Sequence, residues 1–164
     1  VAGDLSEAKI TVAGVPDVPG KAAQIFTVVA AADTNIDMIV QNVSSGGSGQ
    51  TDISFTLPKA EAESALSALK AAQSDIGFSD LALDENIGKL SVVGAGMRTS
   101  SGVSADLFTA LYEAGVNIDM ISTSEIRISV IMRADQLNEA LRKVHTAFGL
   151  DSDVEAVVYA GTGR

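Results

Sequence analysis

The sequence contains no cysteine, no tryptophan and a single histidine among its 164 residues. Without cysteine neither a disulfide nor a thiolate zinc site can form, and one histidine makes a histidine-rich metal site improbable. Aromatic residues are only 4%, which leaves little material for stacking on bases. Basic residues are outnumbered 11 to 21 by acidic ones, for a formal charge of −10. Because this charge repels phosphate backbones and anionic lipid, we expect no nucleic acid or membrane partner and no metal cofactor.

Long apolar runs are also missing, since no stretch approaches the roughly 20 residues of a membrane helix. Residues 1–7 lack the basic start and apolar core of a signal peptide. Hydrophobic residues nevertheless make up 46% of the chain, enough to build a packed core. We therefore expect a folded, soluble protein, with the cytoplasm as its location because cysteine is absent.

An internal repeat organises the chain. The segment Asn-Ile-Asp-Met-Ile at 35–39 recurs at 117–121, an offset of 82 residues (117 minus 35). The same ungapped offset gives seven further identities between positions 8 and 39, or 12 matches in 32 positions. The seven are Ala13, Gly14, Gly20, Ala23, Phe26, Thr27 and Ala32. The repeat predicts two domains, 1–85 and 86–164, between which terminal strands could be exchanged.

Each copy has the pattern of a β-α-β-β-α-β unit, so the fold class is α+β with two tandem ferredoxin-like domains and antiparallel sheets. The expected strands are 9–13, 36–43, 51–57 and 79–83 in the first copy, and 89–93, 118–124, 127–133 and 154–160 in the second. The expected helices cover 22–32, 59–73, 104–114 and 135–148. Domains of about 80 residues are marginally stable alone, so we expect the repeats to pair within and between chains, giving a dimer.

The loop 14–20, Gly-Val-Pro-Asp-Val-Pro-Gly, joins a strand end to the first turn of a helix. Free backbone N–H groups converge at such a terminus, Pro19 presets the helix start, and Gly20 permits close approach, so the loop suits a small carboxylate. Asp17 could hold a cationic amino group. The loop therefore has the minimum equipment to bind a free α-amino acid. The alternative is that Asp17 is an N-cap or turn residue and the glycines only form turns.

The corresponding loop 94–102 has Thr99 where the first has Asp17. Neutral hydroxyls cannot replace the charge of a carboxylate, so the two loops should select different ligands. Gly94-Ala95-Gly96 resembles the start of a dinucleotide fingerprint, but Thr99 stands where the third glycine is needed, and no ATP-binding G-x-x-x-x-G-K-[ST] loop is present.

Catalytic groups are not evident in the sequence. His145 fits a half-buried position on the last helix, with no nucleophile that can be paired with it. Asp37 and Asp119 fall in separate copies, which gives no support to an acid and base pair. Two other functional classes remain open: a small ferredoxin-like enzyme that uses these residues, and a structural dimerisation module without ligand.

Several of these segments together resemble the tandem ACT-domain regulatory region of bacterial aspartokinases, over almost the whole chain. They are the Pro19-Gly20 loop, both Asn-Ile-Asp-Met-Ile segments, Ser-Thr-Ser-Glu-Ile-Arg-Ile-Ser at 122–129 and Val-Val-Tyr-Ala-Gly-Thr-Gly-Arg at 157–164. The likeness is greatest to the actinobacterial type, in which the regulatory part also exists as a short beta subunit.

This resemblance implies that the chain is not itself an enzyme. It would be the sensor through which threonine, with lysine as a second effector, feeds back on the ATP-dependent phosphorylation of aspartate in lysine, threonine and methionine biosynthesis. The implied partners are a second copy of the chain, bound through the ACT domains, and an aspartokinase catalytic (alpha) subunit.

The resemblance also implies two effector sites, each between the loop of one ACT domain and the strand start of the other copy in a partner chain. The threonine site would comprise Asp17, Pro19, Gly20, Ala22, Gln41, Asn117 and Ile118. The lysine-type site would comprise Met97, Thr99, Gly102, Val103, Ser104, Asn35, Ile36 and Asp37, with Ser124 and Glu125 as further candidates. At the first site Asp17 would hold the amino group, backbone amides the carboxylate, and Gln41 the hydroxyl end.

Overall fold

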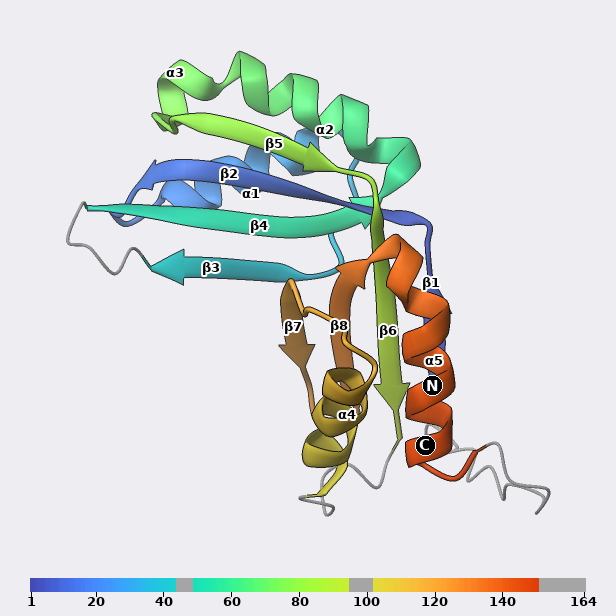
Figure 1. Ribbon diagram of the computed structural model, residues 1–164. Coiled ribbons are helices and arrows are strands. Elements are labelled where there is room, and N and C mark those ends of the chain that lie inside the picture. The colour runs from blue at the N-terminus through green and yellow to red at the C-terminus, as the bar shows by residue number, and fades with distance from the viewer. Residues whose placement is uncertain (44–48, 95–101, 151–164) are drawn as a thin grey trace. The chain divides into compact units, whose positions relative to one another are not determined.

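The computed structural model describes residues 1–43, 49–94 and 102–150, and it divides into two compact units (Figure 1). One unit is Ser6–Glu85. The other combines Val1–Leu5 with the chain from Asn86 onward. Each unit holds one copy of the repeat and one four-stranded antiparallel sheet. The first five residues, which were predicted to belong to the first domain, thus pack with the second repeat.

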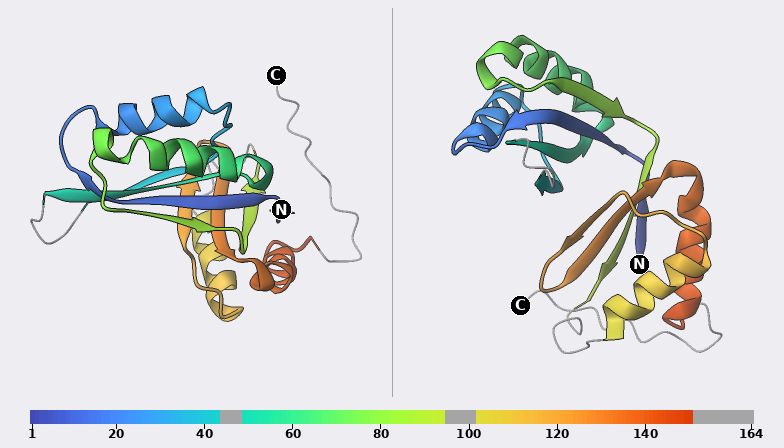
Figure 2. Two further views of the ribbon diagram at one scale, coloured as in Figure 1. Left: turned by 90° about the horizontal axis from the view of Figure 1, so that it is seen from above. Right: turned by 60° about the vertical axis from the view of Figure 1, so that its left-hand side comes forward.

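The first unit has the predicted β-α-β-β-α-β order, with one short additional helix. Its elements are β2 (Glu7–Pro16), α1 (Lys21–Ala31), β3 (Ile39–Val43), β4 (Gln50–Pro58), α2 (Lys59–Ala71), α3 (Gln73–Ile76) and β5 (Asp80–Asp84). The strands lie in the order β3-β4-β2-β5. The helices α1 and α2 lie on one face of this sheet (Figure 2).

The core of this unit follows from the alternation along its strands. Ile10 and Val12 on β2 and Phe55 on β4 have no exposed surface, and they face the buried residues Ile25 and Val29 of α1. Residues two apart on a strand point to the same face, so each strand contributes every second residue to the helix-covered side. The Phe55 ring meets the Phe26 ring edge to face at 5.7 Å between centroids.

The second unit repeats this arrangement with different chain connectivity. Its elements are β1 (Ala2–Asp4), β6 (Ile87–Val93), α4 (Gly102–Glu113), β7 (Met120–Thr123), β8 (Arg127–Arg133), a 3-10 turn (Ala134–Gln136) and α5 (Leu137–Ala147), with the strand order β1-β6-β8-β7. Its core is built from the buried side chains of both helices and of β6 and β8, among them Leu90, Leu107, Leu111, Val130 and Val144.

Strand β1 takes the place beside β6 that β5 takes beside β2. Both edge strands run antiparallel to their neighbour, and Ala2 pairs with Ser91 as Ala82 pairs with Thr11. A Cβ at Gly3 would come within 2.7 Å of Leu141 on α5, so β1 lies tightly under that helix. The start of the chain therefore supplies an edge strand to the sheet of the second repeat. The strand predicted at 154–160 falls outside the described residues.

The first strands of the two repeats, β2 and β6, correspond at an offset of 80 rather than 82. In the first sheet Thr11 Oγ1 lies 2.9 Å from Ser54 Oγ, and in the second Ser91 Oγ lies 2.9 Å from Ser129 Oγ. These equivalent pairs match Thr11 with Ser91. The ungapped offset of 82 is therefore wrong for the first strands, because the loop that follows is two residues longer in the second copy. It holds for the Asn-Ile-Asp-Met-Ile segments that follow the first helix of each copy.

Most predicted elements differ from the observed ones by a few residues at their ends. The strand predicted from 36 begins at Ile39, although Asp37 N–H already donates to the Thr56 carbonyl at 3.0 Å. The helix predicted for 59–73 ends at Ala71 and is followed by α3. No helix in the described part of the chain is long and apolar enough to cross a membrane.

Candidate ligand-binding site

A glycine in the left-handed conformation begins the loop that the sequence singled out. Gly14 has φ +67°, and a Cβ there would lie 2.3 Å from Ser79 Oγ, so only glycine fits both the backbone and the space. The pairing of β2 with β4 shifts register between Val12 and Val15. Such a bulge bends the strand and re-aims its end. The bend directs the chain from the sheet toward the start of α1.

Two hydrogen bonds join this loop to strand β4 and the residue before it. The Gly14 N–H donates to Asp52 Oδ1 at 3.0 Å, and the Asp17 N–H donates to the Gly49 carbonyl at 2.8 Å. Within the loop, Val18 N–H donates to the Pro16 carbonyl at 2.9 Å, which makes a tight turn around Asp17. The Asp17 side chain is exposed at the tip of this turn.

The start of α1 offers open backbone donors. Gly20 is the N-cap in a left-handed conformation, with φ 95°, and no side chain caps this terminus in the described structure. The first N–H groups of a helix have no partner within the helix and carry its positive partial charge. A Cβ built on Gly20 would meet nothing within 4 Å, so space is open beside these donors. An anionic group could therefore reach them.

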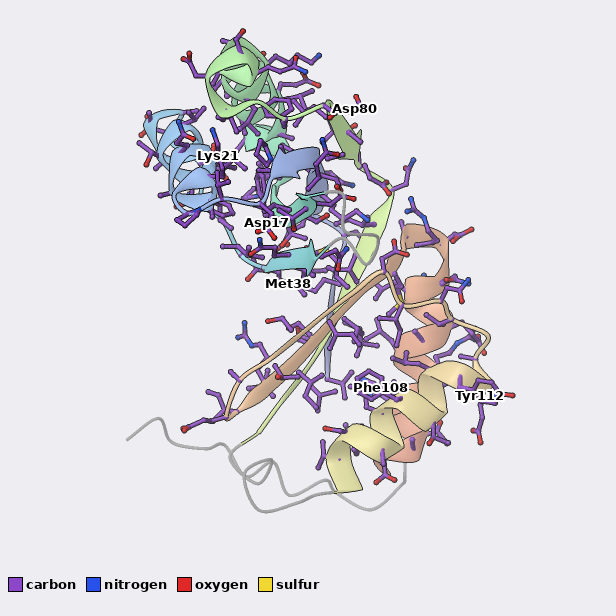
Figure 3. All side chains as sticks on the ribbon, turned by 90° about the vertical axis from the view of Figure 1, so that its left-hand side faces the viewer. Asp17, Lys21, Met38, Asp80, Phe108 and Tyr112 are labelled. Atoms are coloured by element: carbon purple, nitrogen blue, oxygen red, sulfur yellow. The ribbon has the colours of Figure 1, made fainter. Side chains whose placement is uncertain are left out.

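A pocket of ≈ 330 Å³ lies between the loop, the start of α1 and strands β3 and β4. Its buried lining residues are Val15, Thr51 and Ile53, and Thr51 Oγ1 donates to the Asn42 carbonyl at 2.6 Å. The other lining residues are Pro16, Asp17, Val18, Pro19, Gly20, Lys21, Ala22 and Gln41. Figure 3 labels Asp17 and Lys21 at the end of the first unit where the loop meets α1. The pocket combines an apolar floor with one carboxylate, one ammonium group and one amide.

Five residues of the predicted threonine site line this single pocket: Asp17, Pro19, Gly20, Ala22 and Gln41. The other two, Asn117 and Ile118, belong to the second unit, just before β7. Sequence reasoning missed the remaining lining residues, notably Lys21, Thr51 and Ile53. The signal for Thr51 and Ile53 was present, because residues two apart on β4 share the face that Gln41 also occupies.

The residues of the predicted lysine-type site are distributed over both units. Gly102, Val103 and Ser104 form the first turn of α4, and Ser124 and Glu125 lie in the turn between β7 and β8. The Asn-Ile-Asp residues 35–37 precede β3 in the first unit, whereas positions 97 and 99 (methionine and threonine) fall outside the described residues.

Asn35 is held by the first turn of α2. Its backbone N–H and its side-chain Nδ2 donate to Glu61 Oε1 at 3.3 and 3.0 Å. In the second unit Gln136, in the 3-10 turn before α5, similarly donates to the Gly115 carbonyl at 3.3 Å. The loops that lead into both Asn-Ile-Asp-Met-Ile segments are thus fastened to the start of the following helical segment.

The residues considered for catalysis are distributed over the two units. Asp37 and Asp119 lie in different units, and Asp119 forms an ion pair with Arg133 at 3.5 Å. His145 lies half-buried in the last turn of α5. Among the described residues, no three histidine, cysteine or acidic side chains are placed to hold a metal ion.

A larger hollow of ≈ 830 Å³ lies against α5 and is lined by Asn138, Leu141, Arg142, His145 and Thr146. These described lining residues all come from one helix, and Arg142 is already paired with Glu139. The smaller pocket at the loop is enclosed by four elements and brings together groups of opposite charge. We therefore regard the loop pocket as the candidate binding site.

Comparison with known proteins identifies the same repeat. A family model for the ACT domain matches residues 9–73 and 90–148. Over all 164 residues the chain is 56% identical to the aspartokinase of Mycolicibacterium smegmatis, and 51% identical to that of Corynebacterium glutamicum. It spans 39% of the length of each of these relatives.

Solved structures of similar length match more completely. The regulatory subunit of aspartate kinase from Thermus thermophilus, in a ligand-free form, has a TM-score of 0.84 and 42% identity, over 90% of this chain and 95% of that chain. A chain in a crystal structure of aspartokinase alpha and beta subunits has a TM-score of 0.84 and 44% identity, over 90% of this chain and 96% of its own.

Proposed function

The chain belongs to the ACT-domain family, as the regulatory region of an aspartokinase, and on this basis we propose that its loop pocket binds free L-threonine as a feedback signal. The observation that carries the proposal is the pocket itself, which gathers Asp17, Gln41 and the uncapped start of α1 around one small volume. A second effector, lysine, would bind at the site predicted around the start of α4.

The chemistry of the pocket suits a zwitterion. The carboxylate of a free amino acid would accept from the first-turn N–H groups of α1 near Gly20 and Ala22, where the helix dipole favours negative charge. Its ammonium group would donate to the exposed carboxylate of Asp17 in a charge-assisted hydrogen bond. The ligand would thus be oriented by its two charged ends.

The rest of the pocket suits a small, partly polar side chain. Val15 and Ile53 supply an apolar floor for a methyl group, and the amide of Gln41 can bond a hydroxyl. Threonine carries both groups. A site that bonds a hydroxyl discriminates strongly against an analogue without it, because its own polar group is then left unpaired.

Regulation would follow from linkage. We propose that Asn117 and Ile118 of a second copy complete the site, so that bound threonine joins two chains into a homodimer. An effector that binds one arrangement of the two chains more tightly stabilises that arrangement by the difference in binding free energy, typically about 1 to 3 kcal/mol per coupling. A catalytic alpha part would respond to that arrangement, with ATP-dependent aspartate phosphorylation reduced as the result.

The test is calorimetric titration of the chain with L-threonine, L-lysine and L-aspartate, with Asp17→Asn as the key variant. Asp17→Asn keeps the shape and removes the charge, so threonine affinity should fall by about tenfold or more. Asp75→Asn, an exposed aspartate on α3 outside the pocket, should bind as the unmodified chain does.

Normal threonine affinity in Asp17→Asn would disprove the role given to that carboxylate. Absence of threonine binding by the unmodified chain would disprove the sensor function at this pocket. A purely structural dimerisation module would then explain the data better, and turnover of a substrate by the chain alone would instead favour the small enzyme.

A further inference from the structure

We propose that Asp52, a residue outside the pocket, is a positioning residue that holds the loop of the amino-acid site in its binding conformation. This inference rests on the proposed function, since it concerns the same loop. Asp52 lies on β4 between Thr51 and Ile53, two lining residues of the pocket. Successive side chains of a strand point to opposite faces, so Asp52 leaves β4 on the face away from the pocket.

The carboxylate of Asp52 accepts a hydrogen bond from a backbone N–H group that has no partner in the sheet pairing, that of Gly14. The register shift between Val12 and Val15 removes Gly14 from the paired residues of β2 and β4. Its N–H donates instead to Asp52 Oδ1 at 3.0 Å. A backbone N–H left out of a sheet ladder needs another acceptor, and a carboxylate is a strong one. Asp52 thereby fastens the first residue of the loop.

The opposite side of Gly14 is confined as well. Ser79 N–H donates to the Ala13 carbonyl at 2.9 Å, and the Ser79 side chain leaves no space for a Cβ on Gly14. Further along the loop, the Asp17 N–H is bonded to Gly49. The loop is therefore fixed at Gly14 by a side chain and at Asp17 by backbone, and Asp17 is the residue that would hold the ligand's amino group.

The hydrogen bond from the Gly14 N–H to the Asp52 carboxylate, called the clamp below, has no counterpart at the equivalent position of the second unit. Ser54 and Ser129 are equivalent, because each faces a hydroxyl across its sheet, so Asp52 corresponds to Arg127. There the Gly94 N–H donates to the backbone carbonyl of Ile126 at 2.9 Å. Of these two equivalent glycine N–H groups, that of Gly14 is the one held by a side chain, which a point substitution can remove.

Loss of the clamp should weaken ligand binding without touching the ligand. When only a fraction of the molecules has the loop in its binding conformation, the apparent affinity falls by that fraction. Because this hydrogen bond is exposed to water, its loss corresponds to about a five- to tenfold change in the population, less than for a buried charged acceptor. Asp52→Ala should therefore bind threonine more weakly, by up to about five- to tenfold, with saturation still reached.

The experiment compares the unmodified chain with Asp52→Ala, Asp52→Asn and Asp80→Ala by calorimetric titration with L-threonine. Asp52→Asn retains an acceptor oxygen and should stay within about twofold of the unmodified chain. Asp80 is an exposed aspartate on β5, the strand that pairs with β2 on the side opposite β4. Its carboxylate accepts a hydrogen bond from the N–H of the next residue, Leu81, so Asp80→Ala controls for loss of surface charge.

A second readout follows the clamp directly, through hydrogen exchange of the Gly14 amide measured by NMR without ligand. Exchange should be faster in Asp52→Ala and nearly unchanged in the other two variants. Unaltered affinity in Asp52→Ala would overturn the proposal. So would Asp52→Asn binding as weakly as Asp52→Ala while the Gly14 amide stays protected, because the charge would then act on the ligand itself.

If the unmodified chain binds no threonine, the proposed function fails and the role in ligand binding fails with it. The amide exchange of Gly14 distinguishes this case, since it shows whether Asp52 holds the loop irrespective of any ligand.

Discussion

Replacement of Gly14 by alanine tests the geometry on which the binding loop depends. Two separate costs are expected. A non-glycine residue at φ +67° costs about 1 to 2 kcal/mol. The added Cβ would also lie 2.3 Å from Ser79 Oγ and 2.7 Å from Ser79 Cβ, and such overpacking costs about 1 to 3 kcal/mol. Gly14→Ala should therefore destabilise the first unit by about 2 to 5 kcal/mol, the sum of the two ranges.

The same unit offers a control that separates the two costs. Gly77 also has a positive φ, of 87°, but a Cβ there would meet Pro16 at ordinary distances, 3.5 Å from Cγ and 3.9 Å from Cδ. Gly77→Ala should therefore show the backbone cost alone, about 1 to 2 kcal/mol. A third variant, Gly14→Ala combined with Ser79→Gly, should recover the steric part, measured against Ser79→Gly as its own reference.

The assay is urea unfolding of each variant followed by circular dichroism, with the free energy of unfolding extrapolated to zero denaturant. Equal destabilisation by Gly14→Ala and Gly77→Ala would show that Ser79 yields without cost. The tight contact at the start of the loop would then be refuted, and with it one half of the confinement inferred for Gly14.

Two further predictions concern the cores of the units, and both can be measured by the same unfolding experiment. Phe55→Leu should destabilise the first unit by about 1 to 2 kcal/mol, because it removes the edge-to-face contact with Phe26 and leaves a small cavity; a change below about 0.5 kcal/mol would contradict this packing. Ser91→Ala should lower the free energy of unfolding by about 1 kcal/mol or more, because the buried Ser129 hydroxyl loses its partner. Replacing both Ser91 and Ser129 by alanine should cost less than the sum of the two single changes. Strictly additive costs would mean that the two hydroxyls do not depend on each other.

The sequence was sufficient for the class of fold because the relevant patterns are local. The repeated Asn-Ile-Asp-Met-Ile segment, the period-two alternation around Ile10 and Phe55 and the helical spacing of Ile25 and Val29 each arise within a single element. The loop 14–20 was also recognisable, since proline and glycine at a helix start have a direct conformational meaning. Five of the residues predicted there line one pocket.

Partnerships between distant segments could not be derived in this way. Three residues at the start of the chain carry no periodic signal, yet Ala2–Asp4 completes the sheet of the second repeat. Asp52 and Gly14 are 38 positions apart, and their hydrogen bond depends on a bulge that only strand pairing creates. Thr51 and Ile53 line the pocket with Gln41 because β4 pairs with β3, a register that the alternation along β4 does not give by itself.

The sequence by itself indicated most of the segments that become strands and helices, that the unit occurs twice, and where a helix terminus could meet a charged small molecule. Only the tertiary structure decided which strand closes each sheet, which polar groups satisfy the donors left over at the bulge, and which side chains enclose the pocket. The physical reason is that propensity and periodicity act over a few residues. Sheet pairing and the satisfaction of buried or displaced backbone groups depend instead on contacts between segments far apart in the chain.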